Sequence, residues 1–250
     1  MSLPPLSEEF SRVLCVVAHP DDVEYGTASA VAAWTARGVE VAYLLLTKGE
    51  AGMDASTPDK TAELRVREQM AAARAVGVTQ VDFLDHPDGV LVYGLDIRRD
   101  IALAIRRFRP DAVVAQTWEI EVPHGFNQAD HRVCGLATLD AVRDAGNRWV
   151  FTNQLTGGLE PWSPRWLLIP GDANPTHGVD VTGEPLERGI AALEAHAEYI
   201  AGLDGHPTPR HILSMFAAMS GEAMGVKHAV LLRAVDLQAR PSVGTADDEE

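Results

Sequence analysis

Short apolar runs alternate with helix-like segments over the first 145 residues of the chain. Four runs are too short to favour helices and suit strands covered on both faces, at residues 13–18, 39–47, 80–84 and 111–116. Three segments between them have helical features, at residues 27–37, 58–76 and 97–108. In the middle one, apolar residues recur at spacings of three and four, and Thr57, Pro58 and Gly77 supply the start and stop signals. This alternation predicts right-handed βαβ units and therefore a parallel sheet.

The remainder of the chain is less regular. Prolines divide residues 150–175 into short segments, after which residues 186–203 and 211–224 have helical patterns and residues 228–235 a strand pattern. We see no internal repeat and no linker that would divide the chain. We therefore expect one domain over residues 1–250, with a disordered acidic tail from about residue 240.

Composition and charge narrow the class of protein. With 46% hydrophobic and 23% charged residues among 250, the chain is typical of a globular protein with a substantial core. Its 21 basic and 36 acidic residues give a net charge of −15, which argues against nucleic acids and anionic membranes as partners. Two cysteines exclude a disulfide-rich secreted domain. Because we recognise neither a signal peptide nor a membrane span, we expect a soluble cytoplasmic protein; the sequence is compatible with a homo-oligomer.

Polar residues follow the first predicted strand directly. The segment AHPDDVE (18–24) offers one imidazole and three carboxylates, at the sheet edge where ligands bind in open α/β folds. His19 and Asp22 are three residues apart around a turn, so both could face one metal ion, with Asp21 as a general base beside it. The alternative is a polar turn with a capping aspartate.

A second polar segment closes the long loop after the fourth strand. His131 would complete a His-Asp-His set, which is the number of protein ligands typical of a catalytic zinc site. Asp130 either orients an imidazole from behind or caps the following helix, and on its own merits the cap is the more common role.

These two segments carry a resemblance to a known family. AHPDDVE (18–24), followed by DHR (130–132) at the start of a helix, resembles the PIG-L/LmbE-like family of metal-dependent N-deacetylases. Further matches run along the chain: TKGEAG (47–52), RVRE (65–68), PDG (87–89), RPD (109–111), and a weaker block of VDV (179–181) with AALEAH (191–196).

The resemblance implies a Rossmann-like α/β fold, with a mostly parallel sheet and helices on both faces. It implies hydrolysis of an N-acetyl or N-acyl group, usually on an amino sugar or a glycosylated metabolite. By position, His19, Asp22 and His131 resemble the Zn²⁺ ligands, although such ligands also accept Fe²⁺. Asp21 resembles the general base of the family.

Three more residues match positions that line the sugar-binding side of the pocket, namely Glu50, Arg65 and Asp88. Each also has a simpler interpretation. Arg65 could be a solvated helix residue, and Glu50 and Asp88 could be ordinary loop residues.

Two positions depart from the amino-sugar branch of the family. That branch commonly has a histidine where this chain has Gln128, and an aromatic hydroxyl where it has Phe126. Gln128 donates a hydrogen bond but does not transfer a proton in the usual way, and Phe126 does neither. We therefore predict a catalytic set of Asp21, His124, Gln128 and Asp130, in which His124 either compensates for the missing histidine or is only a loop residue.

Three functions are compatible with these residues. The first is a zinc-dependent deacetylase with a changed substrate. The second is a metal-binding pseudoenzyme or binding module with little turnover, and the third is a metal-dependent hydrolase of another bond, such as an ester. We find no GxGxxG after the first strand, no P-loop and no GxSxG, so dinucleotide, nucleotide and serine-hydrolase functions are not indicated.

Overall fold

The computed structural model describes residues 2–122 and 125–239; His124 and the predicted acidic tail from about residue 240 fall outside these ranges. Seven strands form one sheet in the order β3-β2-β1-β4-β7-β9-β8. Their bounds are β1 Arg12–Val17, β2 Glu40–Leu45, β3 Gln80–Phe83, β4 Ala112–Ala115, β7 Trp166–Pro170, β8 His177–Asp180 and β9 Ala229–Asp236. The pairs that β1 forms with β2 and β4, β2 with β3, and β4 with β7 are parallel, whereas β9 is antiparallel to both neighbours. The predicted, mostly parallel sheet is confirmed.

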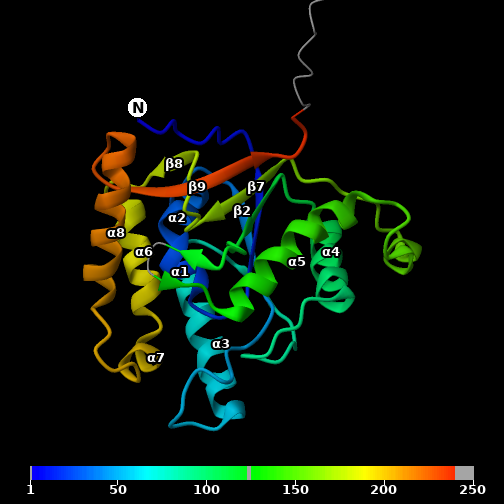
Figure 1. Cartoon of the computed structure of the whole chain (residues 1–250). Coiled ribbons are helices and arrows are strands. Elements are labelled where there is room, and N and C mark those ends of the chain that lie inside the picture. Colours follow the sequence, from blue (N-terminus) through cyan, green and yellow to red (C-terminus); the bar gives the residue numbers. More distant parts are fainter. Residues whose placement is uncertain (1, 123–124, 240–250) are drawn as a thin grey trace, which may run out of the picture.

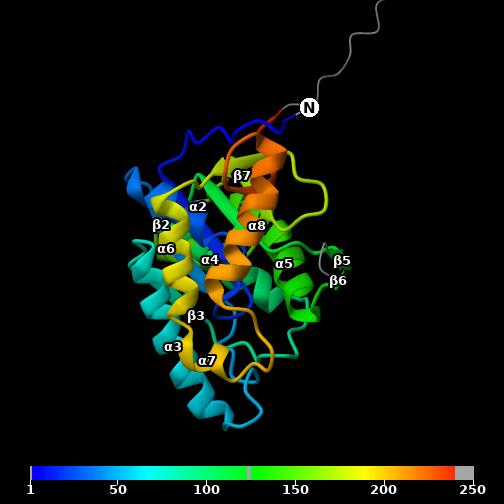
Figure 2. The ribbon, with the colours of Figure 1, turned by 90° about the vertical axis from the view of Figure 1, so that its left-hand side faces the viewer.

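Helices cover both faces of this sheet, as Figure 1 shows, with α6 and α8 on one side and α4 and α5 on the other. Their bounds are α1 Asp22–Gly26, α2 Ala28–Ala36, α3 Pro58–Ala75, α4 Leu95–Phe108, α5 Ala129–Gly146, α6 Glu184–Glu194, α7 Ala197–Ala201 and α8 Pro209–Met224, with a short 3₁₀ helix at Thr152–Gly157. Figure 2 looks onto the face covered by α6 and α8. None of the helices in the described ranges is long and apolar enough to cross a membrane.

The central strand β1 supplies side chains to two cores. Val13, Cys15 and Val17 join α2, α3, α6 and α8 in one core, whereas Leu14 and Val16 join α4 and α5 in the other. This period-two alternation is what a strand with helices on both faces requires.

The end of α5 is held by a buried arginine from α4. Arg106 is 1% exposed, and its guanidinium donates hydrogen bonds of 2.9–3.2 Å to the backbone carbonyls of Asp144, Ala145, Asn147, Val150 and Phe151. The last carbonyls of a helix have no hydrogen-bond donor within the helix, and here the Arg106 guanidinium is that donor. The Arg106 side chain therefore ties α4 to the end of α5.

Two details differ from the sequence predictions. The loop after β4 contains a small hairpin, β5 (Glu121–Val122) and β6 (Gly125–Phe126), which hydrophobic periodicity did not indicate. The single helix predicted over residues 186–203 is wrong, because α6 ends at Glu194 and α7 begins at Ala197. At the break, His196 is fully buried, and the Glu198 amide in the first turn of α7 donates to the Glu68 carboxylate on α3.

Candidate metal and catalytic site

Three predicted ligands converge at the carboxyl ends of β1 and β4. His19 Nδ1 lies 3.3 Å from His131 Nε2 and 3.5 Å from an oxygen of Asp22, and His131 Nε2 lies 3.0 Å from the other Asp22 oxygen. Ligand atoms around a tetrahedral zinc ion lie roughly 3.3 Å apart, given bonds of about 2.0–2.1 Å. The three side chains therefore have the spacing and the chemistry of one face of such a site.

Close packing of α5 places His131 there. Gly135 lies one helical turn after His131, and a Cβ at that position would lie 2.3 Å from the backbone oxygen of Gln116, at the end of β4. Gln116 also accepts the amide of Ala18 at 2.9 Å, just before His19. The absence of a side chain at position 135 thus allows the helix to rest directly on the strand ends.

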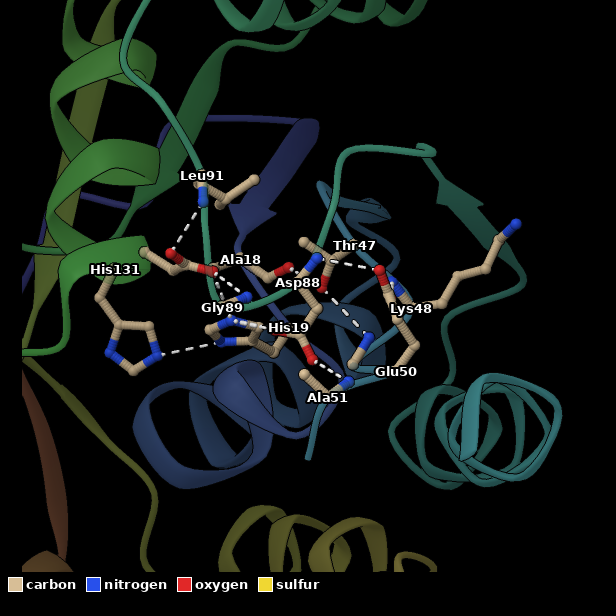
Figure 3. A network of polar contacts seen from close by, with 12 residues as sticks. Ala18, His19, Thr47, Lys48, Glu50, Ala51, Asp88, Gly89, Leu91 and His131 are labelled. Atoms are coloured by element: carbon tan, nitrogen blue, oxygen red, sulfur yellow. Dashed lines mark hydrogen bonds and ion pairs between the residues drawn. The ribbon is translucent and has the colours of Figure 1, made fainter. Parts of the chain in front are cut away.

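The second nitrogen of His19 faces two carboxylates. Nε2 lies 3.0 Å from Asp88 Oδ1 (Figure 3). It lies 3.3 Å from Asp130 Oδ2. These three residues could also hold a cation, but Asp130 already accepts the amides of Gly89 and Leu91, at 2.7 and 3.1 Å. A carboxylate that binds the far nitrogen of a histidine fixes the ring for metal binding, so we interpret Asp88 and Asp130 as supports of His19.

Charge in the site favours a cation. Burial lowers the pKa of His19, but hydrogen bonds and charge from Asp22 and Asp88 outweigh it and raise the pKa to about 11. Burial likewise raises the pKa of Asp22, yet His131 and His19 bring it well below its usual range. The carboxylates thus stabilise positive charge on the His19 imidazole, and a divalent ion bound at the site would supply positive charge there instead. The donor set fits the metal that the sequence predicts.

Asp21 lies beside this group, and its carboxylate contacts other partners. Its side chain is buried, and Arg65 Nη2 donates to Oδ2 at 3.0 Å. Burial raises the pKa of Asp21 from 3.8 to about 7, and the opposing charge of Arg65 does not cancel this effect. A carboxylate with a pKa near neutrality is suited to general-base catalysis.

Arg65 is 2% exposed, so its interpretation as a solvated helix residue is wrong. Besides Asp21, its guanidinium donates to the Pro20 carbonyl at 2.6 Å and stacks 3.8 Å above the ring of Tyr199. Sequence reasoning missed Tyr199, which lies on α7. The turn between α6 and α7, which brings this ring over Arg65, left no signal in the local pattern.

Glu50 and Asp88 connect two loops at the rim. Glu50 accepts the amides of Lys48 and Asp88, at 3.2 and 2.9 Å, and Asp88 Oδ2 accepts the amide of Ala51 at 2.7 Å (Figure 3). Both carboxylates therefore fix the loop after β2 against the loop after β3. Their predicted contact with a substrate stays a prediction.

The start of α5 differs from the sequence prediction. The N-cap residue is Gln128, and Asp130 lies inside the first turn, so the interpretation of Asp130 as the cap is wrong. Its carboxylate binds loop amides and His19 instead. Gln128 is exposed and Phe126 is 80% exposed, while Asn127 between them is buried and donates to the Thr117 carbonyl at 2.8 Å. His124 lies outside the described residues, so its predicted role stays a prediction.

The two cysteines belong to the core. Cys15 and Cys134 are fully buried, and burial raises the pKa of both thiols well above the usual range. Neither is a thiolate nucleophile.

The chain is similar to known proteins in sequence and in fold. Residues 14–142 match the PIG-L family, described as GlcNAc-PI de-N-acetylase. The diacetylchitobiose deacetylase of Thermococcus kodakarensis is 30% identical over 191 residues, which cover 75% of this chain and 70% of that protein. The 1D-myo-inositol 2-acetamido-2-deoxy-alpha-D-glucopyranoside deacetylase of Acidothermus cellulolyticus is 28% identical and covers 88% of each chain. The structure of the N,N'-diacetylchitobiose deacetylase from Pyrococcus horikoshii superimposes with a TM-score of 0.81 at 25% identity, over 92% of this chain and 85% of that one.

Proposed function

The chain belongs to the PIG-L family of metal-dependent de-N-acetylases, which act on amino-sugar-containing substrates, and from this premise we propose how its own residues perform the reaction. We propose that His19, Asp22 and His131 hold Zn²⁺ and that Asp21 is the general base. The observation that carries the proposal is the convergence of three ligand atoms at 3.0–3.5 Å beside a buried carboxylate.

When bound, the zinc ion would polarise the amide carbonyl and lower the pKa of an attacking water. The protein's own contribution is to orient the ligands. Asp88 and Asp130 accept from the far nitrogen of His19 and leave Nδ1 for the metal. The backbone amide of His19 donates to Asp22 Oδ2 at 2.7 Å, which orients that carboxylate as well.

Asp21 accepts the proton of the attacking water. Arg65 binds Oδ2, so the proton would be taken at Oδ1. With its pKa raised by burial to about 7, protonated Asp21 can then return the proton to the leaving amine. His124 and Gln128 are the candidates to assist at the oxyanion or the amine, on the sequence argument alone.

We propose N-acetylglucosamine units as the substrate group, because diacetylchitobiose and GlcNAc-inositol deacetylases are among the similar proteins. The test incubates zinc-loaded protein with N-acetylglucosamine, N,N'-diacetylchitobiose and an ester analogue, and measures acetate and free amine. Amide hydrolysis above ester hydrolysis supports the proposal.

The role of Asp21 is tested by Asp21→Asn, with the exposed Asp96→Asn as the matched control. We expect Asp21→Asn to keep one zinc per chain and to lose at least about 100-fold in turnover, while Asp96→Asn retains it. Normal turnover of Asp21→Asn would refute the assignment. A His19→Ala or His131→Ala protein that still bound one zinc would refute the ligand set.

A further inference from the structure

The backbone of Asp21 has an uncommon conformation. Its φ of 78° lies in the left-handed region, which residues other than glycine adopt only when the surrounding structure holds them there. This turn separates two adjacent carboxylates. Asp22 contacts the histidines of the metal site, whereas Asp21 contacts Arg65. This backbone angle at Asp21 therefore lets one carboxylate face the metal site while its neighbour faces Arg65.

One turn of α3 holds the peptide in place. The amide of Asp21 donates to Gln69 Oε1 at 2.8 Å, and Arg65, four residues earlier on the same helix face, donates to the Pro20 carbonyl. Gln69 is 1% exposed, so water does not compete for this bond. The peptide between Pro20 and Asp21 is thus held at both its carbonyl and its amide by one helix.

Gln69 also reaches a buried carboxylate on α1. Its Nε2 donates to Glu24 Oε1 at 3.0 Å, and Glu24 is 1% exposed. The orientation of the Gln69 amide follows from the backbone N–H of Asp21, which only donates and therefore faces Oε1, so that Nε2 faces Glu24. One side chain thus links the peptide of Asp21 to a carboxylate three residues later.

A buried histidine faces this carboxylate from behind. His196 Nε2 lies 3.7 Å from Glu24 Oε2, and His196 is fully buried at the break between α6 and α7. Within the described residues, neither ring nitrogen of His196 makes a hydrogen bond, and neither does Glu24 Oε2. His196 thus faces a buried carboxylate that takes no part in the proposed mechanism.

We propose that Gln69 is a positioning residue for the base: with Glu24, which His196 faces, it holds the Asp21 peptide in the left-handed conformation that keeps the base apart from the ligand. The inference rests on the proposed role of Asp21. Among the residues that the structure describes, the Gln69 side chain forms hydrogen bonds with the Asp21 backbone and with Glu24 alone. Its loss should therefore affect the catalytic step more than substrate binding or zinc binding.

The first test replaces Gln69 with Met, which is similar in length and lacks both hydrogen bonds. The matched control is Gln154→Met. Gln154 is also buried, donates to the Arg99 carbonyl at 2.7 Å and accepts from Arg106 at 2.7 Å, but it lies on the 3₁₀ helix. We expect kcat of zinc-loaded Gln69→Met to fall about 10- to 100-fold, with KM and zinc stoichiometry unchanged. Gln154→Met should keep kcat even where it unfolds at a lower urea concentration.

The second test exchanges the two side chains of the bridge. Gln69→Glu alone still accepts the Asp21 amide but sets a carboxylate against Glu24, so kcat should fall. Adding Glu24→Gln supplies an amide that donates to the new carboxylate, and the double variant should recover most of the loss. This rescue depends on the hydrogen-bond pattern, so it also decides the matter if Gln69→Met fails to fold.

The outcomes separate the inference from the proposed function. If Gln69→Met turns over normally while Asp21→Asn is inactive, Asp21 is the base and the positioning role of Gln69 is wrong. An equal loss of kcat in Gln154→Met, or no rescue in the double variant, would reduce Gln69 to a structural residue. If Asp21→Asn turns over normally, the proposed function itself fails.

Discussion

The support of His19 by Asp88 leads to a quantitative prediction for zinc affinity. Asp88 Oδ1 is the nearer of two carboxylate oxygens at His19 Nε2, at 3.0 Å against 3.3 Å for Asp130. Loss of such a partner typically weakens metal binding 10- to 100-fold. In Asp88→Asn the Asp130 carboxylate remains, and the single amide oxygen can still accept from His19 although the bond to the Ala51 amide is lost. We therefore expect the lower end of this range, a loss of zinc affinity of about tenfold or about 1.4 kcal/mol.

The measurement is a competition between the protein and a chromophoric zinc chelator at fixed pH. Asp85→Asn is the matched control, because Asp85 is exposed, lies three residues earlier in the same loop and pairs with the partly buried Lys48. We expect its zinc affinity to match that of the unmodified protein. If Asp88→Asn binds zinc normally and instead shows a raised KM, then Asp88 contacts the substrate and the reasoning from the His19 geometry is refuted.

Three further predictions concern stability, pH and thiol reactivity. Arg106→Met should lower the free energy of unfolding in urea by at least about 3 kcal/mol, because it leaves several carbonyls at the end of α5 without partners, whereas exposed Arg107→Met should change it little. Because burial raises the pKa of Asp21 to about 7, kcat should rise with pH as the carboxylate ionises. A bound cation moves the midpoint of this rise to lower pH. A kcat that is constant between pH 5 and 8 would contradict the assignment of Asp21 as the base. Cys15 and Cys134 should react with a thiol reagent only after unfolding, so labelling of either under native conditions would show that the thiols are more accessible than their burial implies.

The sequence was sufficient to bring together the candidate ligands that directly follow a strand or begin a helix. His19 and Asp22 follow β1 directly, and His131 begins α5 after β4. Parallel strands bring their carboxyl ends to one edge, so predicting the strands placed these residues together. The resemblance to the PIG-L family then assigned roles that spacing alone left open.

Contacts between loops could not be predicted from the order of strands and helices. Asp130 appeared as a helix cap because caps are decided by neighbours in sequence, whereas its partners Gly89 and Leu91 lie about 40 residues away. Gln69 is one polar residue on a helix with many, and its role depends on Asp21, 48 positions earlier. The i, i+4 relation of Gln69 to Arg65 is the one signal that could have pointed to it.

Gly135 is not a metal ligand, but it affects the position of one, because it allows α5 to lie directly on the strand ends. Because any Cβ there would meet the Gln116 carbonyl, a larger residue must lift α5 from the sheet, and His131 one turn away would move with it. Helix propensity alone would favour alanine at position 135. Which side chains this position accepts is instead decided by the close approach of α5 to Gln116, and therefore by the placement of His131. An engineer who wished to admit a larger cation while keeping every donor atom could begin here, by changing how closely two backbones approach.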